Sequence, residues 1–241
     1  MENFKCLLTA SSITIFPNLS IRIPTVGEIL EDEQHYYNLI SSLTATPFQY
    51  MVQLDDIGID FTKLTDYQLF LMLLPPLAQG DMHILFGDTD LSDIFACKHP
   101  LNDTVILYSP QNDIVIDELI YHQMADCIRK INNLKKETRK PGNKEAKDFR
   151  IKLERKKQKR HARKPYEPYL EKLVVALVNR PEFKYNYEQV MHLTIYQFQQ
   201  SFTQIQTGIN FNHTMTGVYS GTIDTSKLKD RSCLSWISMH Q

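Results

Sequence analysis

Apolar residues in the first 75 positions recur mostly at helical spacing, which predicts three or four short helices. The exception lies at 13–23, where apolar and β-branched residues flank Pro17 and predict a short strand or an extended arm. Thr25 followed by Glu28 has the pattern of a capping box. A helix is therefore expected to begin at Thr25.

Two further helices are expected before residue 80. Thr46-Pro47 is typical of an N-cap followed by a first-turn proline, and Gly58 is a good stop signal. Thr65 can cap a helix over 67–74 that two prolines then end. Because the residues of this helix are apolar on all sides, it should be the most buried helix of this half.

The apolar period changes after residue 80. Segments 91–95, 104–108 and 113–117 have the pattern of short strands, and the turn residues at 109–112 predict a hairpin between the last two. A broad apolar stripe over 119–131 then predicts a helix.

The remainder of the chain is predicted to be helical. A thin apolar stripe among good helix formers predicts a polar helix over 145–161, and stronger stripes begin at Leu170, at Tyr187 and after Thr194. The expected fold class is therefore α+β, mostly helical. We expect four parts: a helical N-terminal unit over 1–80, a β-hairpin with a helix over 81–134, a basic linker and helix over 135–164, and a helical C-terminal unit over 165–241.

Charge forms three blocks that the net charge of −1 conceals. Residues 1–128 carry 4 Lys/Arg and 18 Asp/Glu, a net of −14, whereas 129–164 carry 17 basic and 4 acidic residues, a net of +13. These blocks can attract each other within one chain or between copies. The alternative is that the basic block binds a polyanion, but the whole chain lacks the positive surplus that a nucleic-acid binder usually keeps.

Composition and motifs argue against several classes of protein. No apolar run approaches the roughly 18–20 residues of a membrane span, and the first residues lack a signal-peptide pattern. Four scattered cysteines form neither a disulfide framework nor a metal knuckle. Phosphate-binding and nucleophile motifs are absent from the sequence. We expect an intracellular protein with no enzymatic activity, no membrane contact, no metal and no cofactor.

Individual polar residues also favour structural roles. The acidic loop at 88–93 lacks the Gly and Glu of an EF-hand, and the eight histidines lack metal-ligand spacing. Asp55 and Asp56 project about 100° apart on a helix, and two carboxylates at a helix C-terminus are unfavourable. Cys127 lies beside basic residues that could lower its pKa, but without a base partner we expect it in the core.

Two sets of residues are candidate partner-binding surfaces. The basic helix over 144–164 would make many phosphate contacts on nucleic acid, but few aromatic residues are present to stack on bases, so a solvated or protein-facing helix is preferred. The apolar candidates lie in the N-terminal half, although core packing is the commoner use of any one of them. The basic set is Lys152, Arg155, Lys156, Lys159, Arg160 and Arg163; the apolar set is Phe48, Met51, Phe70 and Met72.

Several segments, in this order, together resemble tail-morphogenesis proteins of phages and prophages of Gram-positive bacteria. They are LDDIGIDF at 54–61, LTDYQLF at 64–70, DIVID at 113–117 with Ile120 and Tyr121, FKYNYE at 183–188, LTIYQF at 193–198, GVYSG at 217–221 and LSW at 234–236. The resemblance spans about residues 24–237. These motifs consist of apolar and turn residues, so they indicate kinship rather than chemistry.

The resemblance implies a non-enzymatic tail assembly chaperone, or a minor tail or baseplate component. Its partners would be other tail proteins. The charge blocks, independently of the resemblance, allow a homo-oligomer as well. It would act in the host bacterial cytoplasm, and a virion component would remain in the tail. The helix over 144–164 is richer in Lys and Arg than the family pattern, which leaves nucleic-acid binding through this helix as the alternative.

Overall fold

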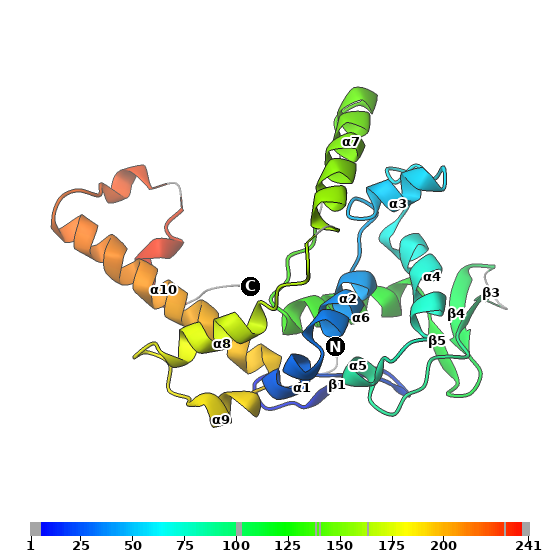
Figure 1. The fold of residues 1–241 in the computed structure, drawn as a ribbon, viewed down its shortest axis with the longest axis horizontal. Coiled ribbons are helices and arrows are strands. Elements are labelled where there is room, and N and C mark those ends of the chain that lie inside the picture. The colour runs from blue at the N-terminus through cyan, green and yellow to red at the C-terminus, as the bar shows by residue number, and fades with distance from the viewer. Residues whose placement is uncertain are drawn as a thin grey trace.

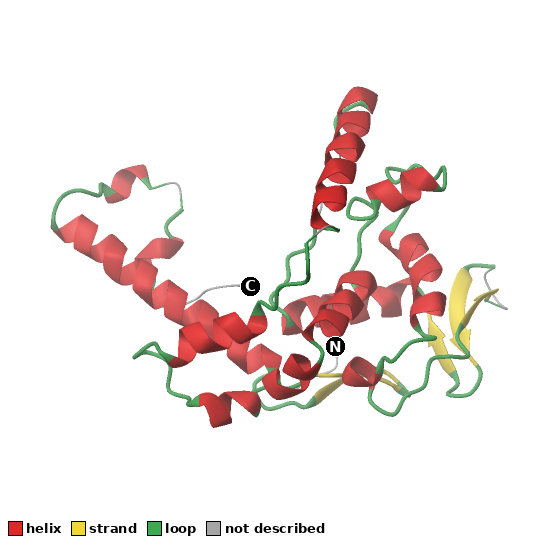
Figure 2. Ribbon diagram, viewed as in Figure 1, coloured by secondary structure: helices red, strands yellow, loops and turns green. Residues whose placement is uncertain are grey.

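In the computed structural model the described residues are 6–99, 103–137, 139, 141–162, 164–228 and 230–237. The fold is α+β and mostly helical, which confirms the expected class (Figure 1, Figure 2). The strands of the described ranges form two small antiparallel sheets, β1-β2 and β3-β4-β5.

The first sheet is a hairpin of β1 (Ser12–Phe16) and β2 (Leu19–Arg22). The segment predicted as one strand or an arm therefore supplies both strands. Pro17 and Asn18 make the turn, and Asn18 adopts a left-handed φ of 65°, a conformation that Asn tolerates better than most residues.

A capping box on Thr25 and Glu28 starts α1 (Val26–Glu31), as the sequence predicted. The helix then breaks at Asp32, whose carboxylate accepts a hydrogen bond from the backbone N–H of His35 at 3.0 Å. This new N-cap starts α2 (Glu33–Leu43).

The next two helices differ from prediction at one end each. Residues 47–50 form turns, so α3 (Met51–Asp56) begins later than Thr46-Pro47 suggested, although Gly58 follows it with the expected positive φ of 73°. The prediction that prolines end the next helix is wrong, because α4 (Asp66–Leu77) contains both in its last turn. A proline φ is compatible with a helix. Each of these prolines removes one backbone donor, yet the helix closes beyond them, where the Ala78 N–H donates to the Leu74 carbonyl at 2.8 Å.

The second sheet contains β3 (Phe95–Lys98), β4 (Val105–Ser109) and β5 (Ile114–Ile116), and α5 (His83–Phe86) precedes it. The hairpin turn is where the sequence placed it, but the strand predicted over 91–95 is shifted. Asp93 accepts hydrogen bonds from the Ser109 hydroxyl and the Gln111 N–H, which holds this segment in a loop.

The remaining elements are helices. Their bounds are α6 (Glu118–Ile131), α7 (Lys144–His161), α8 (Leu170–Val178), α9 (Tyr187–Met191), α10 (Ile195–Tyr219) and the 3₁₀ turns η1 (Thr225–Lys227) and η2 (Ser232–Leu234). α7 rises from the body beside α3, and α10 extends away from it on another side (Figure 1). The segment of η2 folds back along α10, where Gln204 Nε2 donates to the Trp236 carbonyl at 2.6 Å. None of the described helices is both long and apolar enough to cross a membrane.

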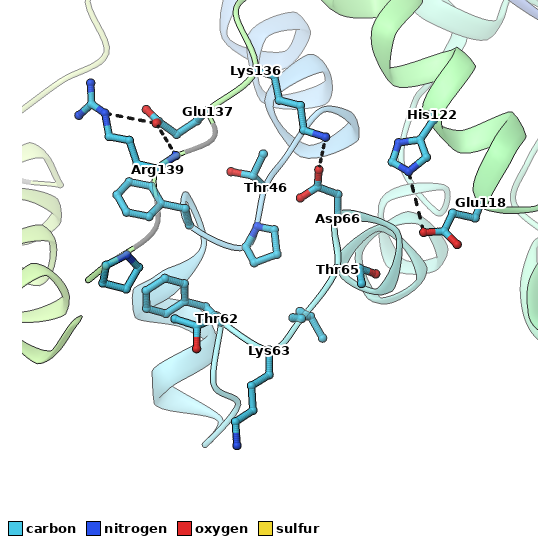
Figure 3. A pocket seen from close by; sticks show the side chains of 15 residues that line it. Thr46, Thr62, Lys63, Thr65, Asp66, Glu118, His122, Lys136, Glu137 and Arg139 are labelled. Carbon is cyan, nitrogen blue, oxygen red and sulfur yellow. Dashed lines mark hydrogen bonds and ion pairs between the residues drawn. The ribbon is translucent and has the colours of Figure 1, made fainter. Parts of the chain in front are cut away.

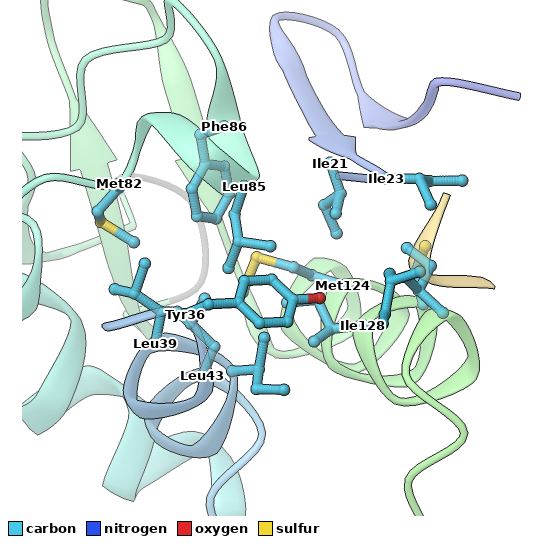
Figure 4. Packing of buried hydrophobic residues seen from close by; sticks show 14 of the residues in the cluster. Ile21, Ile23, Tyr36, Leu39, Leu43, Met82, Leu85, Phe86, Met124 and Ile128 are labelled. Carbon is cyan, nitrogen blue, oxygen red and sulfur yellow. The ribbon is translucent and has the colours of Figure 1, made fainter. Parts of the chain in front are cut away.

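One main hydrophobic core lies between the first hairpin, α2, α5 and α6 (Figure 4). Within it the Tyr36 hydroxyl donates a 2.6 Å hydrogen bond to Asn132 Oδ1, which joins α2 to the end of α6. The core also receives buried residues of α8, α9 and the start of α10. The expected parts 1–80, 81–134 and 165–241 therefore share one core.

Candidate functional site

The basic helix α7 is attached to the rest of the molecule mainly through α3. Ile151, which is 7% exposed, enters a second, smaller cluster with Met51, Val52 and Leu54 of α3. Burying one such side chain stabilises by about 1.5–3 kcal/mol, more than the 0–1 kcal/mol typical of an exposed ion pair. This apolar contact therefore contributes more to holding α7 than any one ion pair.

Arg155 pairs the basic helix with the two adjacent carboxylates at the end of α3. Its Nη1 lies 2.5 Å from Asp56 Oδ1 and its Nη2 lies 2.8 Å from Asp55 Oδ2. The hydrogen bond to Asp56 and the charges of both carboxylates raise the pKa of the Arg155 guanidinium. The two carboxylates diverge on the helix, yet the planar fork of one arginine reaches both. Their unfavourable position at a helix C-terminus is therefore offset by Arg155.

A second ion pair lies nearer the start of α7, where Lys147 Nζ is 3.0 Å from Asp60 Oδ2. The hydroxyl of Thr62 also donates to Asp60, at 2.8 Å. The hydrogen bonds from Thr62 and from Lys147 lower the pKa of Asp60 to about 2. Asp60 is therefore ionised throughout the neutral and mildly acidic range.

The basic block thus pairs with part of the acidic half of its own chain. Outside α7, Lys136 Nζ lies 2.6 Å from Asp66 Oδ2. Within α7, the Arg150 guanidinium lies 5.7 Å from the centre of the Phe48 ring. That ring distance is in the range of a cation–π contact. The intrachain form of the predicted charge pairing is present at these positions.

The opposite side of α7 is exposed. We define the outward face of α7 as Phe149, Lys152, Leu153, Lys156 and Arg160, which cluster on one side at helical spacing. Phe149 is 66% exposed and Leu153 is 52% exposed. Its three cations have no ion-pair partner among the described residues.

The predicted basic set is therefore divided. Arg155 is turned to α3, whereas Lys152, Lys156 and Arg160 lie on the outward face and Lys159 is exposed beside it. Arg163 lies outside the described residues.

The four apolar candidates do not form one surface, which corrects that prediction. Met51 is 4% exposed and Phe70 is 2% exposed, so both are core residues. Phe48 is half-buried against Phe61, and Met72 alone is exposed, at 41%. Helical periodicity could not separate these cases because α4 packs on several sides, yet not on the side of Met72.

An open pocket of about 480 Å³ lies beside this region, between the start of α4, the start of α6 and the segment after α6 (Figure 3). Phe48 and Phe61 supply apolar walls. The charged residues on its rim pair mostly with one another: Lys136 with Asp66, Arg139 with Glu137 and, at 3.9 Å, His122 with Glu118. These pairs neutralise much of the charge that a ligand would meet.

The other polar candidates lie apart. His122 lines this pocket and His99 lines another, and His83 is 3.5 Å from Asp88. In the described ranges no group of three or more His, Cys, Asp and Glu side chains is placed to hold a metal ion. Burial raises the pKa of Cys127 to about 11, the opposite of the shift that its basic neighbours suggested.

Sequence reasoning missed a buried carboxylate, that of Glu33 in α2. Its Oε1 accepts hydrogen bonds from the Tyr166 hydroxyl at 2.9 Å and from the backbone N–H groups of Tyr169 and Leu170 at 2.7 and 3.1 Å. Because these N–H groups begin α8, Glu33 caps that helix from a distant part of the chain. No local pattern signals such a cap.

Comparison with protein families gives a match in the C-terminal part of the chain. Residues 156–240 match the family model of the YomV second domain. YomV is a phage-encoded protein of Bacillus. The match covers less than half of the chain and indicates a phage-associated protein. Comparison with curated proteins and with solved structures gave no match.

The matched range begins inside α7 and includes α8, α9 and α10. The phage resemblance seen in the sequence motifs is therefore supported for the C-terminal part. Two cations of the outward face, Lys156 and Arg160, fall within the matched range.

Proposed function

We propose that the protein acts in phage tail assembly through protein–protein contacts and without catalysis, as an assembly chaperone or a minor tail or baseplate component. The observation that carries the proposal is α7, which stands out from the body (Figure 1) and whose outward face is exposed, apolar and basic. A projecting helix of this kind suits docking to another protein. The match to a domain of a phage-encoded protein supports the setting.

The proposed partners are other tail proteins, met in the host cytoplasm. A chaperone would release them before the particle is complete, whereas a virion component would keep the contact. Nucleic-acid binding by α7 is the second candidate, favoured by the exposed Lys152, Lys156 and Arg160. The exposed Phe149 and Leu153 on the same face favour a protein partner instead.

The test is deletion of the gene from the phage or prophage that encodes it. We expect tailless or short-tailed particles in electron micrographs, with normal filled heads. Mass spectrometry of wild-type particles then separates the two roles, because only a virion component remains in them. Particles with normal tails after the deletion would contradict the proposal.

A further inference from the structure

We propose that the outward face of α7 docks onto the acidic loop side of a second copy of this chain. This extends the proposed function by naming one partner. Its test uses purified protein, so it can fail while the role in tail assembly holds. Three features of the described residues carry it.

The first feature is the make-up of the outward face. Phe149 and Leu153 lie one turn apart, both more than half exposed, and Lys152, Lys156 and Arg160 surround them. Exposed apolar side chains framed by charge are typical of a protein contact. Phosphate binding would use the cations but would leave the two apolar side chains without a role.

The second feature is an acidic surface of matching composition. Segment 81–93 carries Asp81, Asp88, Asp90 and Asp93 and contains no Lys or Arg. The Asp88 carboxylate is fully exposed, and the His83 ring lies 3.5 Å from it. Phe95, which follows this segment, is 46% exposed. The carboxylates of this segment, which an exposed aromatic residue follows in the chain, are opposite in charge to the cations beside Phe149 and Leu153.

The carboxylates of this acidic surface are not neutralised by Arg22, a cation of the same chain that lies near them. Arg22 is a basic residue close to it, since its Nη1 donates to the His83 carbonyl at 3.4 Å. Its Nη2, however, lies 2.6 Å from Glu28 Oε1. The charge of Arg22 is therefore already paired with Glu28.

The third feature is position. α5, which lies within 81–93, is on the opposite side of the body from the outer part of α7 (Figure 1). The two surfaces therefore do not meet within one chain. A contact between them joins different patches of two copies, so it can repeat from copy to copy. The −14 and +13 blocks of each chain then compensate each other along the assembly.

The experiment is analytical ultracentrifugation of the full chain, freed of nucleic acid, at about 50 mM and about 500 mM salt, which shortens the screening length severalfold. We expect assembly at low salt and monomers at high salt. One variant reverses the outward face, Lys156→Glu with Arg160→Glu, and another reverses the acidic surface, Asp88→Lys with Asp90→Lys. Each double variant alone should raise the dissociation constant of self-association at low salt at least tenfold.

Mixing the two variants tests the proposed contact directly. The reversed outward face of one variant is then complementary in charge to the reversed acidic surface of the other. The mixture should recover salt-sensitive assembly. A matched control, Lys184→Glu with Arg231→Glu, makes the same charge change at exposed sites elsewhere and should assemble as the wild type does. All substituted residues are exposed, and unchanged circular dichroism melting verifies the fold.

Three results would overturn the proposal. They are a monomeric wild type at low salt, assembly that survives either reversal, and a mixture that stays monomeric. A monomer that instead binds a DNA or RNA fragment, and loses it in Lys156→Glu with Arg160→Glu, would assign the outward face to nucleic acid.

Discussion

The hydroxyl of Tyr36 in α2 and the amide oxygen of Asn132 at the end of α6 form a buried hydrogen bond of 2.6 Å. Asn132 Nδ2 donates in turn to the Ile128 carbonyl at 3.0 Å, which fixes the orientation of the amide. Burial raises the pKa of the Tyr36 phenol far above its usual value, so this donor keeps its proton at any physiological pH.

Tyr36→Phe should lower the free energy of unfolding by about 1–3 kcal/mol, because it leaves Asn132 Oδ1 buried without a donor. Urea unfolding followed by circular dichroism measures the change. Tyr219→Phe is the matched control, since Tyr219 is 83% exposed and should be within about 0.5 kcal/mol of wild type. Equal stability of the two variants would contradict the role of this hydrogen bond.

Glu33→Ala should destabilise the junction between α2 and α8. It removes one acceptor from three donors, two of them backbone N–H groups at the start of α8. The expected loss is about 1–3 kcal/mol or somewhat more, since a charged acceptor is removed. Urea unfolding measures it, with the exposed Glu31→Ala as control. If Glu31→Ala lowers the free energy of unfolding as much as Glu33→Ala does, the hydrogen bonds of Glu33 to α8 do not explain the loss.

The attachment of α7 separates into an apolar and an ionic part. Ile151→Ala should cost about 2–4 kcal/mol of local stability, because it removes a buried side chain from the small cluster. Arg155→Ala should cost clearly less than Ile151→Ala, because its ion pairs are partly exposed. Hydrogen exchange of the amides of α7 measures both. The reverse order of the two effects would show that charge, rather than burial, holds the helix.

Acid should weaken the contact between Lys147 and Asp60. Hydrogen bonds from Thr62 and Lys147 lower the pKa of Asp60 from 3.8 to about 2 in the folded chain. The stabilisation is therefore present above about pH 4 and is lost as the pH falls towards 2. Asp60→Asn should remove this part of the pH dependence of unfolding. If the free energy of unfolding falls equally below pH 4 in the wild type and in Asp60→Asn, the contact with Lys147 is not the source of this acid sensitivity.

Local signals in the sequence predicted the starts of α1, α4 and α10 correctly. The caps at Thr25, Thr65 and Thr194 each place a side-chain oxygen within three residues of the N–H that it accepts from, so the pattern is visible in a short window. The two carboxylates at 55–56 were the best clue to the site. They stood at a helix end where two negative charges need compensation.

The partner of those carboxylates could not be found locally, because Arg155 lies 100 residues from Asp55. The same holds for Glu33, whose cap to Tyr169 spans 136 residues. The misplaced strand has a similar cause: Leu91 and Ile94 are buried as strand residues would be, but from a loop that Asp93 holds through Ser109 and Gln111. The apolar pattern of this segment therefore indicated its burial correctly. The hydrogen bonds of Asp93 to distant residues determine that its backbone is a loop and not a strand.

α10 begins deep in the core, where Ile195 and Phe198 are fully buried, and ends in solvent at Tyr219. At its root the Ile195 N–H donates to the Pro24 carbonyl, and the Val26 N–H donates to the Leu193 carbonyl, each at 2.8 Å. The first turn of α10 is therefore fixed to the start of α1, whereas its last turns extend into solvent. A displacement of its outer turns would therefore be passed to the start of α1 through these two bonds, and to the end of α6 through the contact of Asn133 with Thr203.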